Sequence, residues 1–555
     1  MSVIRPVLIV GAGLTGLTAA IELSRLGVPV RLIDKRPGPS AIPRTLVIHS
    51  LTAELFQQRG LKLETLPASS RVTHAAIYRK GGLLGTAELA PDRDHRGHVL
   101  LVRQAEMESL LLEQLARQDV AADWDTEMIA LAQAERGRWR EPGGSGVSAL
   151  LRHPGSDLED IAASYVISAD GVQGTTDRLL DLPSYDKPGE RHYTLADVRL
   201  DGDFRADLIS VFLGGSGFVM LLPGGGGGRF GCVATDPRPH HGGHGAPGMA
   251  ELQQRLDGCL PAPGRLRSVR WSSRYLASPH LSPVLRHGRV FFGGDSAYAY
   301  SSAMGQSANS GIQDMINLGW KLAMVLQEKA ASDLLATYAG ERLQAIYQLE
   351  RRWEVPAKVL GSSSPQVRKL VAPIALGVHY PPFWQDLSAD LAGEVIPDYW
   401  SSPLSAPPRG PGGLRPGGSV PDMWVFASDP GAPAGTHPRA IRLHELVSPS
   451  RLSLLLTDDT GAGPSAQHQQ LEPWRKLLAV HMVAPVPDHE QRLRFFRSFC
   501  TQSLILVRPD SYVCFVGREK ALPRLVTWLD IWFPPVPGAG RLVRRRRWAG
   551  RLCSI

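Results

Sequence analysis

Three glycines near the N-terminus have the residue type and spacing to hold a nucleotide. Gly11, Gly13 and Gly16 form the pattern GxGxxG directly after the apolar run Val7–Val10 and before a stretch with helical periodicity. The first glycine permits a tight turn, the second lets the backbone approach a pyrophosphate, and the third allows close packing of helix on strand. A structural glycine turn without a nucleotide is the alternative.

Residues that follow these glycines extend the predicted site. Leu14 and Thr15 begin the helix, whose free N–H groups and positive dipole suit phosphates. Asp34 ends the second apolar run and can accept hydrogen bonds from a ribose diol, and Lys35 lies beside it. The pattern predicts a β-α-β nucleotide site, but by itself it does not separate FAD from NAD.

Two later segments share one pattern, in which an apolar run typical of a buried strand is followed by an aspartate next to a glycine. Asp170 precedes Gly171, with Arg178 further on, and Gly294 precedes Asp295. We expect Asp295 to bond the ribityl chain of a flavin. The helix that follows should point its first amides at the pyrimidine edge of the flavin, where its dipole favours negative charge. The residues expected at that helix start are Gly305, Gln306, Ser307, Ala308 and Asn309.

With these motifs in this order, the chain resembles the flavoprotein aromatic hydroxylases of the para-hydroxybenzoate and phenol hydroxylase superfamily. It is most similar to the branch that hydroxylates polyketides and phenols and has a C-terminal thioredoxin-like domain. Residues 311–323 match the helix after the Gly-Asp motif, and 506–510 match a strand of the third domain. Arg44 matches an arginine that contacts the flavin, and Gln104 matches a glutamine at the cofactor.

The resemblance implies an FAD-dependent monooxygenase that consumes NADPH or NADH and O2. It implies noncovalent FAD and hydroxylation of an aromatic, polyketide or phenolic, substrate through a flavin C4a-hydroperoxide. No second GxGxxG is present, which fits a nicotinamide that binds transiently, with Asp170 and Arg178 serving both cofactors. A structural ion pair between these two residues is the alternative. The alternatives for function are Baeyer–Villiger oxygenation of a polycyclic ketone, and flavin binding without oxygenase activity.

The chain departs from the family in the segment after the Gly-Asp motif. The usual residues are a histidine, two prolines and two glycines; here they are Tyr298, Ser301, Ser302, Met304 and Ser307. We expect Tyr298, Met304 and Gln306 near the flavin, with the side chains at 304 and 307 crowding it; no side chain is a certain catalytic group. Substrate contacts are predicted for Phe212, Phe218, Met220, Trp271 and Tyr300, although each such residue type is often simply core.

The expected fold class is α/β. A discontinuous Rossmann-type FAD-binding domain covers 1–75, 100–180 and 286–398, and a mixed β-sheet substrate domain covers 76–99 and 181–285. A stretch rich in Pro, Gly and Ser at 399–419 predicts a linker or strap. A thioredoxin-like α/β domain is expected at 420–540, followed by a basic tail at 541–555.

Composition limits the other classes of function. The 555 residues carry a net charge of +8 and are 43% hydrophobic, as in ordinary globular proteins. The charges are dispersed, so no nucleic-acid partner is expected; Arg544–Arg547 are read as a solvated tail, with an anionic contact as the alternative. Five cysteines without a CxxC argue against a zinc or thiol-redox centre, and His240, His241 and His244 favour a solvated loop over a metal site. No stretch is apolar enough to span a bilayer, and the chain is read as cytoplasmic with a possible homodimer.

Overall fold

The computed structural model describes most of the chain. The described residues are 4–79, 81–88, 99–133, 146–172, 174–182, 185–186, 191–202, 204–214, 217–224, 228–235, 245–260, 264–277, 280–281, 284–299, 306–361, 399, 401–406, 414–429, 437–457, 466–499 and 503–535.

The chain divides into two compact units. The first comprises Met1–Arg25, Pro29–Met315 and Ile346–Ile396, and the second comprises Leu26–Val28, Ile316–Ala345 and Pro397–Ile555. Helices α6 (Gln306–Leu326) and α7 (Ala336–Gly361) therefore contribute to both units. The sequence places both helices in the FAD-binding domain, whereas 316–345 cluster with the C-terminal residues in the structure.

A six-stranded sheet forms the centre of the first unit. Its strand order is β20 (Arg286–His287), β21 (Val290–Phe292), β12 (Tyr165–Ser168), β1 (Val7–Val10), β2 (Val30–Ile33) and β8 (Ala122–Asp123). All but β20 pair in parallel, and β1 is buried along its whole length. This explains why the run is apolar at every position, because a strand of a covered parallel sheet has no solvent face. Helix α1 (Leu14–Arg25) follows β1 and completes the predicted β-α-β unit.

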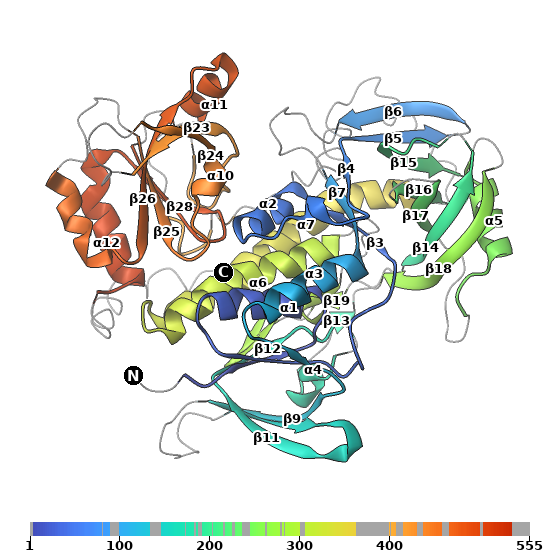
Figure 1. The fold of residues 1–555 in the computed structure, drawn as a ribbon, viewed down its shortest axis with the longest axis horizontal. Helices are drawn as coiled ribbons and strands as arrows, with labels where there is room; N and C mark the ends of the chain where they lie inside the picture. Colours follow the sequence, from blue (N-terminus) through green and yellow to red (C-terminus); the bar gives the residue numbers. More distant parts are fainter. Residues whose placement is uncertain are drawn as a thin grey trace. The chain divides into compact units, whose positions relative to one another are not determined.

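The first unit also contains a separate seven-stranded sheet (Figure 1). Its order is β18 (Arg265–Ala277), β14 (Arg191–Asp201), β17 (Arg229–Thr235), β16 (Phe218–Pro223), β15 (Leu208–Leu213), β5 (His74–Arg79) and β6 (Gly82–Glu88). Helix α5 (Met249–Asp257) packs Leu252 and Leu256 on one face. The opposite face joins Val47 of β3 and Val99 and Leu101 of β7 in a separate core.

Short elements complete the first unit. The smaller sheets contain β11 (Leu158–Ala163), β10 (Val147–Arg152) and β9 (Glu127–Gln133); β13 (Tyr185–Asp186), β19 (His280–Leu281) and β22 (Tyr298–Ala299); and β3 (Thr45–Ile48), β7 (Val99–Arg103) and β4 (Ser70–Val72). The remaining helices are α2 (Ser50–Gln58), α3 (Gln104–Ala116) and α4 (Thr176–Leu179), with a 3-10 turn η3 at Gly294–Ser296.

The second unit contains a six-stranded sheet with helices on both faces. The order is β24 (Arg439–Arg442), β23 (Trp424–Ser428), β26 (Leu478–Pro485), β25 (Leu452–Thr457), β27 (Leu504–Val507) and β28 (Val513–Gly517). Strand β25 pairs in parallel with β26 and antiparallel with β27, which pairs antiparallel with β28. Helix α12 (Leu522–Trp532) covers one face and α11 (His489–Phe499) the other; α10 (Leu443–Leu446) follows β24. This arrangement is that of a thioredoxin-like core with two added strands.

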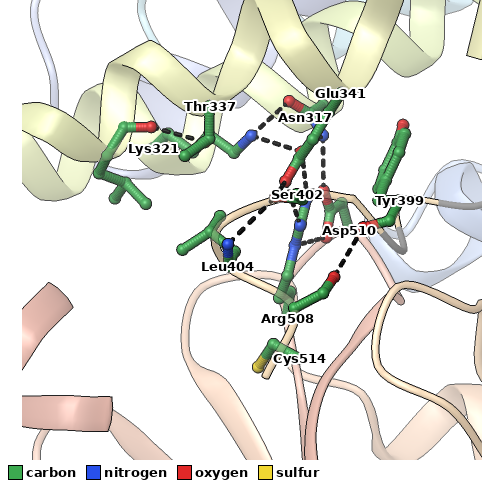
Figure 2. Close-up of polar contacts among 12 residues, drawn as sticks. Asn317, Lys321, Thr337, Glu341, Tyr399, Ser402, Leu404, Arg508, Asp510 and Cys514 are labelled. Carbon is green, nitrogen blue, oxygen red and sulfur yellow. Dashed lines mark hydrogen bonds and ion pairs between the residues drawn. The ribbon is translucent and has the colours of Figure 1, made fainter. Parts of the chain in front are cut away.

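A buried charge network holds the second unit together (Figure 2). Arg508 donates from both terminal nitrogens to Glu341 of α7, at 2.7 and 2.9 Å, and also pairs with Asp510. Lys321 of α6 donates to the same Glu341 carboxylate at 2.6 Å, and Asn317 donates to Glu341 at 2.8 Å. The side chains of Lys321 and Glu341 are fully buried and that of Arg508 is 1% exposed. The network therefore joins α6, α7 and the segment after β27.

The charge state of this network follows from its geometry. Burial alone would raise the pKa of Glu341, but Arg508 and Lys321 hold it far below its usual value. Burial lowers the pKa of Lys321 to about 8, although Glu341 opposes that shift. Arg508 is also enclosed by the rings of Trp320, Tyr399 and Tyr512, which suit a guanidinium. Tyr399 and Ser402, from the stretch predicted as a linker or strap, are buried beside it.

We expect Arg508→Met to destabilise the second unit strongly. Removal of the guanidinium leaves Glu341 and Asp510 buried with one cation fewer, which costs about 3–5 kcal/mol. Urea unfolding monitored by tryptophan fluorescence measures the change. The matched control is Arg475→Met in the exposed pair with Glu472, for which about 0–1 kcal/mol is expected. Equal effects of the two substitutions would contradict the importance of the network.

Candidate functional site

One cavity of about 230 Å³ in the first unit brings together residues from distant parts of the sequence. Six of the predicted cofactor residues line it, namely Gly11, Gly13, Asp34, Lys35, Gln104 and Asp170. They come from the ends of β1, β2 and β12 and from the start of α3. The cavity therefore lies at the carboxyl ends of neighbouring parallel strands, where open α/β sheets bind ligands.

The three N-terminal glycines have different geometric reasons to lack a side chain. A Cβ at Gly11, whose φ is +102°, would lie 2.3 Å from the Ala169 carbonyl oxygen. A Cβ at Gly16 would lie 1.7 Å from the Gly11 carbonyl oxygen. A Cβ at Gly13 would meet no protein atom within 4 Å. Gly11 and Gly16 thus serve the fold, whereas the space at Gly13 is open beside the helix start, which fits a pyrophosphate there.

Asp34 is an ionised acceptor at the edge of this cavity. Its carboxylate accepts from the Ala12 N–H at 2.7 Å and pairs with Arg36 at 2.9 Å. Burial alone would raise the pKa of Asp34, but the hydrogen bonds from Arg36 and Ala12 lower it below its usual value. The two carboxylate oxygens already accept five hydrogen bonds, four of them from Arg36, so a ribose would share or replace part of the pairing with Arg36.

Gln104 and Glu108 line another part of the same cavity. Gln104 donates from Nε2 to Glu108 Oε1 at 2.8 Å, and its backbone N–H donates to the Arg44 carbonyl oxygen at 2.9 Å. Glu108 is fully buried and accepts from the Ser40 N–H at 3.0 Å. These bonds fix the start of α3 against the segment that leads into β3.

Asp170 is held by the start of α4. Its carboxylate accepts from the backbone N–H groups of Thr175 and Thr176, at 2.7 and 3.1 Å, and from the Ser168 hydroxyl at 2.7 Å. Asp170 and Arg178 both belong to the described residues, and no ion pair joins them; Arg178 is exposed. The structural ion pair considered as an alternative is therefore not formed.

Asp295 lies in the turn after β21, and the residue is exposed. Desolvation by the surrounding protein is the main influence on its carboxyl and raises its pKa. Arg44 lowers the pKa through its charge, and a hydrogen bond from the Ser307 side chain lowers it further. Three residues predicted from separate segments are therefore close together.

Tyr298 and Asn309 support this region from within. Tyr298 is 1% exposed and donates its hydroxyl to Asp314 rather than lying open to a ligand. Asn309 accepts from the His49 N–H at 2.9 Å and donates to the Val47 carbonyl oxygen at 2.8 Å. Its amide thus fastens α6 to the end of β3.

The predicted substrate residues lie on different faces of the seven-stranded sheet. Phe218 and Met220 belong to the core shared with β3 and β7. Phe212 belongs to the core under α5 and stacks on Tyr78, with ring centroids 4.9 Å apart. Phe212 therefore does not share a cavity wall with the other two. Trp271 is half-buried and pairs with Asp197 across β18 and β14.

Some predictions fall outside the described residues. Tyr300, Met304, Gly305, the three histidines at 240, 241 and 244, and Arg544–Arg547 belong to this group, as does the side chain of Gln306. Among the residues that the structure does describe, no cluster of three or more His, Cys, Asp or Glu side chains is suited to a metal ion. In the same part of the chain, no helix combines the length and apolar character needed to cross a membrane.

The sequence did not predict several residues of the cavity wall. They include Arg36, Thr126, Glu127, Met128 and Thr175. Arg36 follows the predicted acidic residue by two positions, so its pairing with Asp34 had a local signal. Thr126, Glu127 and Met128 reach the cavity only through the pairing of distant segments, which no local pattern reports.

Comparisons with known proteins agree with this geometry. Residues 5–353 match the family model of the FAD binding domain, and 414–535 match that of the aromatic-ring hydroxylase C-terminal domain. The chain is 29% identical to 6-methylpretetramide 4-monooxygenase of Streptomyces rimosus over 96% of this chain and 95% of that one. It is 31% identical to pentachlorophenol 4-monooxygenase of Sphingobium chlorophenolicum over 62% of each. The solved structure of the anhydrotetracycline hydroxylase OxyS from Streptomyces rimosus superposes with a TM-score of 0.73 at 21% identity, covering 96% of this chain and 99% of that one.

The chain belongs to the family of FAD-binding aromatic-ring hydroxylases. It is a flavin-dependent monooxygenase with FAD as cofactor and NAD(P)H and O2 as co-substrates, and the resemblance inferred from its motifs is confirmed.

We expect Gly13→Val to abolish FAD binding while the apoprotein still folds. The added side chain enters space that contains no protein atom, but that space is where a pyrophosphate would approach the backbone. The FAD dissociation constant, measured by flavin fluorescence, should rise about 100-fold or more. Gly16→Ala is the contrasting variant, because its Cβ collides with the Gly11 carbonyl and should destabilise the apoprotein. Full FAD occupancy of the Gly13→Val protein would refute this assignment.

His49 predicts a pH dependence of stability. Burial lowers the pKa of His49 to about 4, whereas the unfolded chain has the ordinary value of 6.5. As pH falls below 6.5 the unfolded state takes up a proton that the folded state resists. The free energy of unfolding should therefore decrease between about pH 6.5 and 4, by about 3 kcal/mol from this group.

Urea unfolding of the wild type and of His49→Gln across this pH range isolates the effect. The variant lacks the imidazole, so its stability should depend less on pH than that of the wild type. Parallel pH profiles for the two proteins would contradict the prediction.

Proposed function

We propose that this monooxygenase hydroxylates a polycyclic aromatic substrate of the polyketide type. The observation that carries the proposal is the extent of the match to 6-methylpretetramide 4-monooxygenase, which runs through both the FAD-binding and C-terminal domains. The match to the monooxygenase named for a single-ring phenol covers only 62% of this chain. The C-terminal unit is thus shared with the relative whose named substrate is the larger.

The residues of the first unit would divide the work of binding FAD. The open space at Gly13 and the amides at the start of α1 would take the pyrophosphate. Asp34, kept ionised by Arg36, would accept from the ribose of the adenosine half. Asp295, with Arg44 and Ser307 beside it, would hold the part of the cofactor near the flavin. When bound, FAD supplies the redox chemistry that activates O2 for insertion into a ring.

The protein's own contribution is positioning and exclusion of water. The aromatic substrate must be held with one ring carbon close to the reactive position, since orientation lowers the entropic part of the barrier. Phe218, Met220 and Val211 belong to a hydrophobic core of the seven-stranded sheet, and a substrate held against such a surface would be kept from water. No acid–base triad is required of the side chains, which agrees with the absence of such a motif in the sequence.

Product analysis tests the proposal. Purified holoenzyme is supplied with NADPH or NADH, 18O2 and a tetracyclic polyketide phenol, with a monocyclic phenol as the matched comparison. We expect substrate-dependent oxidation of the nicotinamide, one 18O atom on a ring carbon, and kcat/KM for the tetracycle at least about tenfold above that for the phenol. A ring-expanded lactone would indicate Baeyer–Villiger oxygenation instead. Hydrogen peroxide as the sole oxygen product with every aromatic tested would contradict the proposal.

A further inference from the structure

The turn that carries Asp295 is fastened to α6 through a buried tyrosine. The Tyr298 hydroxyl donates to Asp314 Oδ2 at 2.5 Å, and the Gly294 backbone N–H donates to the same oxygen at 2.9 Å. Tyr298 is 1% exposed and Asp314 is fully buried. Asp314 therefore fixes both the beginning of the turn and the strand that leaves it.

A second hydroxyl acts on Asp295 itself. The Ser307 side chain, in the first turn of α6, hydrogen-bonds the Asp295 carboxyl. Ser307 is only half-buried, and Asp295 keeps an exposed surface. The bond thus orients a carboxyl that remains open to a ligand.

Both hydroxyls occur where this chain departs from the pattern of its family. The resemblance places a histidine at position 298 and a glycine at position 307, whereas this chain has Tyr298 and Ser307. Each introduced hydroxyl donates to a carboxylate of the same small region. Tyr298 and Ser307 therefore act on the same small region, although they are nine positions apart in the sequence.

The backbone here leaves little room for adjustment. Gly294 has φ of +59°, and a Cβ at this position would lie 2.5 Å from Thr15 Oγ1. The hydrogen bond from Tyr298 to Asp314 adds a second restraint on the residues that follow Gly294.

We propose that Tyr298, acting through Asp314, and Ser307, acting directly on Asp295, are positioning residues that fix the Asp295 carboxylate for bound FAD. This inference rests on the FAD site argued above and concerns affinity for the cofactor, not the choice of aromatic substrate. Asp314 is fully buried, hydrogen bonds to carboxylates are the strong class, and a group that is already oriented costs less to order when a ligand binds.

Cofactor affinity of the apoprotein tests the inference. Tyr298→Phe and Ser307→Ala each remove one hydroxyl and leave the rest of the side chain in place. We expect each variant to raise the FAD dissociation constant about tenfold, as flavin fluorescence measures it. Tyr165→Phe is the matched control, because Tyr165 is a buried tyrosine of β12, in a different sheet from Tyr298, and its ring contacts Phe291 and Arg289 rather than Asp314; its dissociation constant should stay within about twofold of wild type.

A double-mutant cycle separates positioning from a general loss of stability. In an Asp295→Ala background there is no carboxylate to orient, so Tyr298→Phe and Ser307→Ala should each change the FAD dissociation constant by less than about twofold. A full tenfold penalty in that background, or single variants that bind FAD like wild type, would overturn the inference. Ser307→Ala alters a half-buried position at a helix start, so it keeps the test available if Tyr298→Phe does not fold. The titrations contain no aromatic substrate, so failure of hydroxylation would leave their outcome unaffected.

Discussion

The close approach of three backbone segments at Thr15 sets the geometry of the cofactor site. A Cβ at Gly294 would lie 2.5 Å from Thr15 Oγ1, and a Cβ at Gly311 would lie 2.4 Å from the same atom. Only residues without side chains let the start of α1, the turn after β21 and helix α6 meet in this way. The end of α1 that would take the pyrophosphate and the turn that presents Asp295 therefore have a common point of support. This contact explains why glycines from positions far apart in the chain belong to one site.

The parts of this site that the sequence predicted are those with local patterns. The apolar run Val7–Val10, the glycines after it and Asp34 define a β-α-β unit within a short stretch, and the structure contains that unit. The hydrogen bonds that Asp170 makes were harder to predict from the sequence. Its carboxylate caps the start of α4, a geometry that depends on Thr175 and Thr176 more than on the basic residue that follows them. Phe212 shows a different limit: alternation along β15 separates it from Val211, but no pattern in the strand tells which face borders the substrate.

The second unit depends on interactions that no local pattern reveals. Arg508 and Glu341 are 167 positions apart, and their ion pair is fully enclosed. The sequence shows only charged residues in a helix and a strand end, which are usually solvated. Burial of such a pair requires several simultaneous partners, since an isolated charge in the interior is very costly. Lys321, Asn317 and Asp510 supply those partners.

In the proposed site one cofactor, FAD, extends from the cavity at Gly13 and Asp34 to the turn at Asp295. A crystal structure of the protein with bound FAD tests this claim most directly. We expect the pyrophosphate against Gly13 and the start of α1, the adenosine ribose at Asp34, and the Asp295 carboxylate in hydrogen-bond contact with the flavin half of the cofactor. An FAD whose adenosine lies outside the Gly13–Asp34 cavity, or a nicotinamide nucleotide bound there while FAD occupies another site, would contradict it.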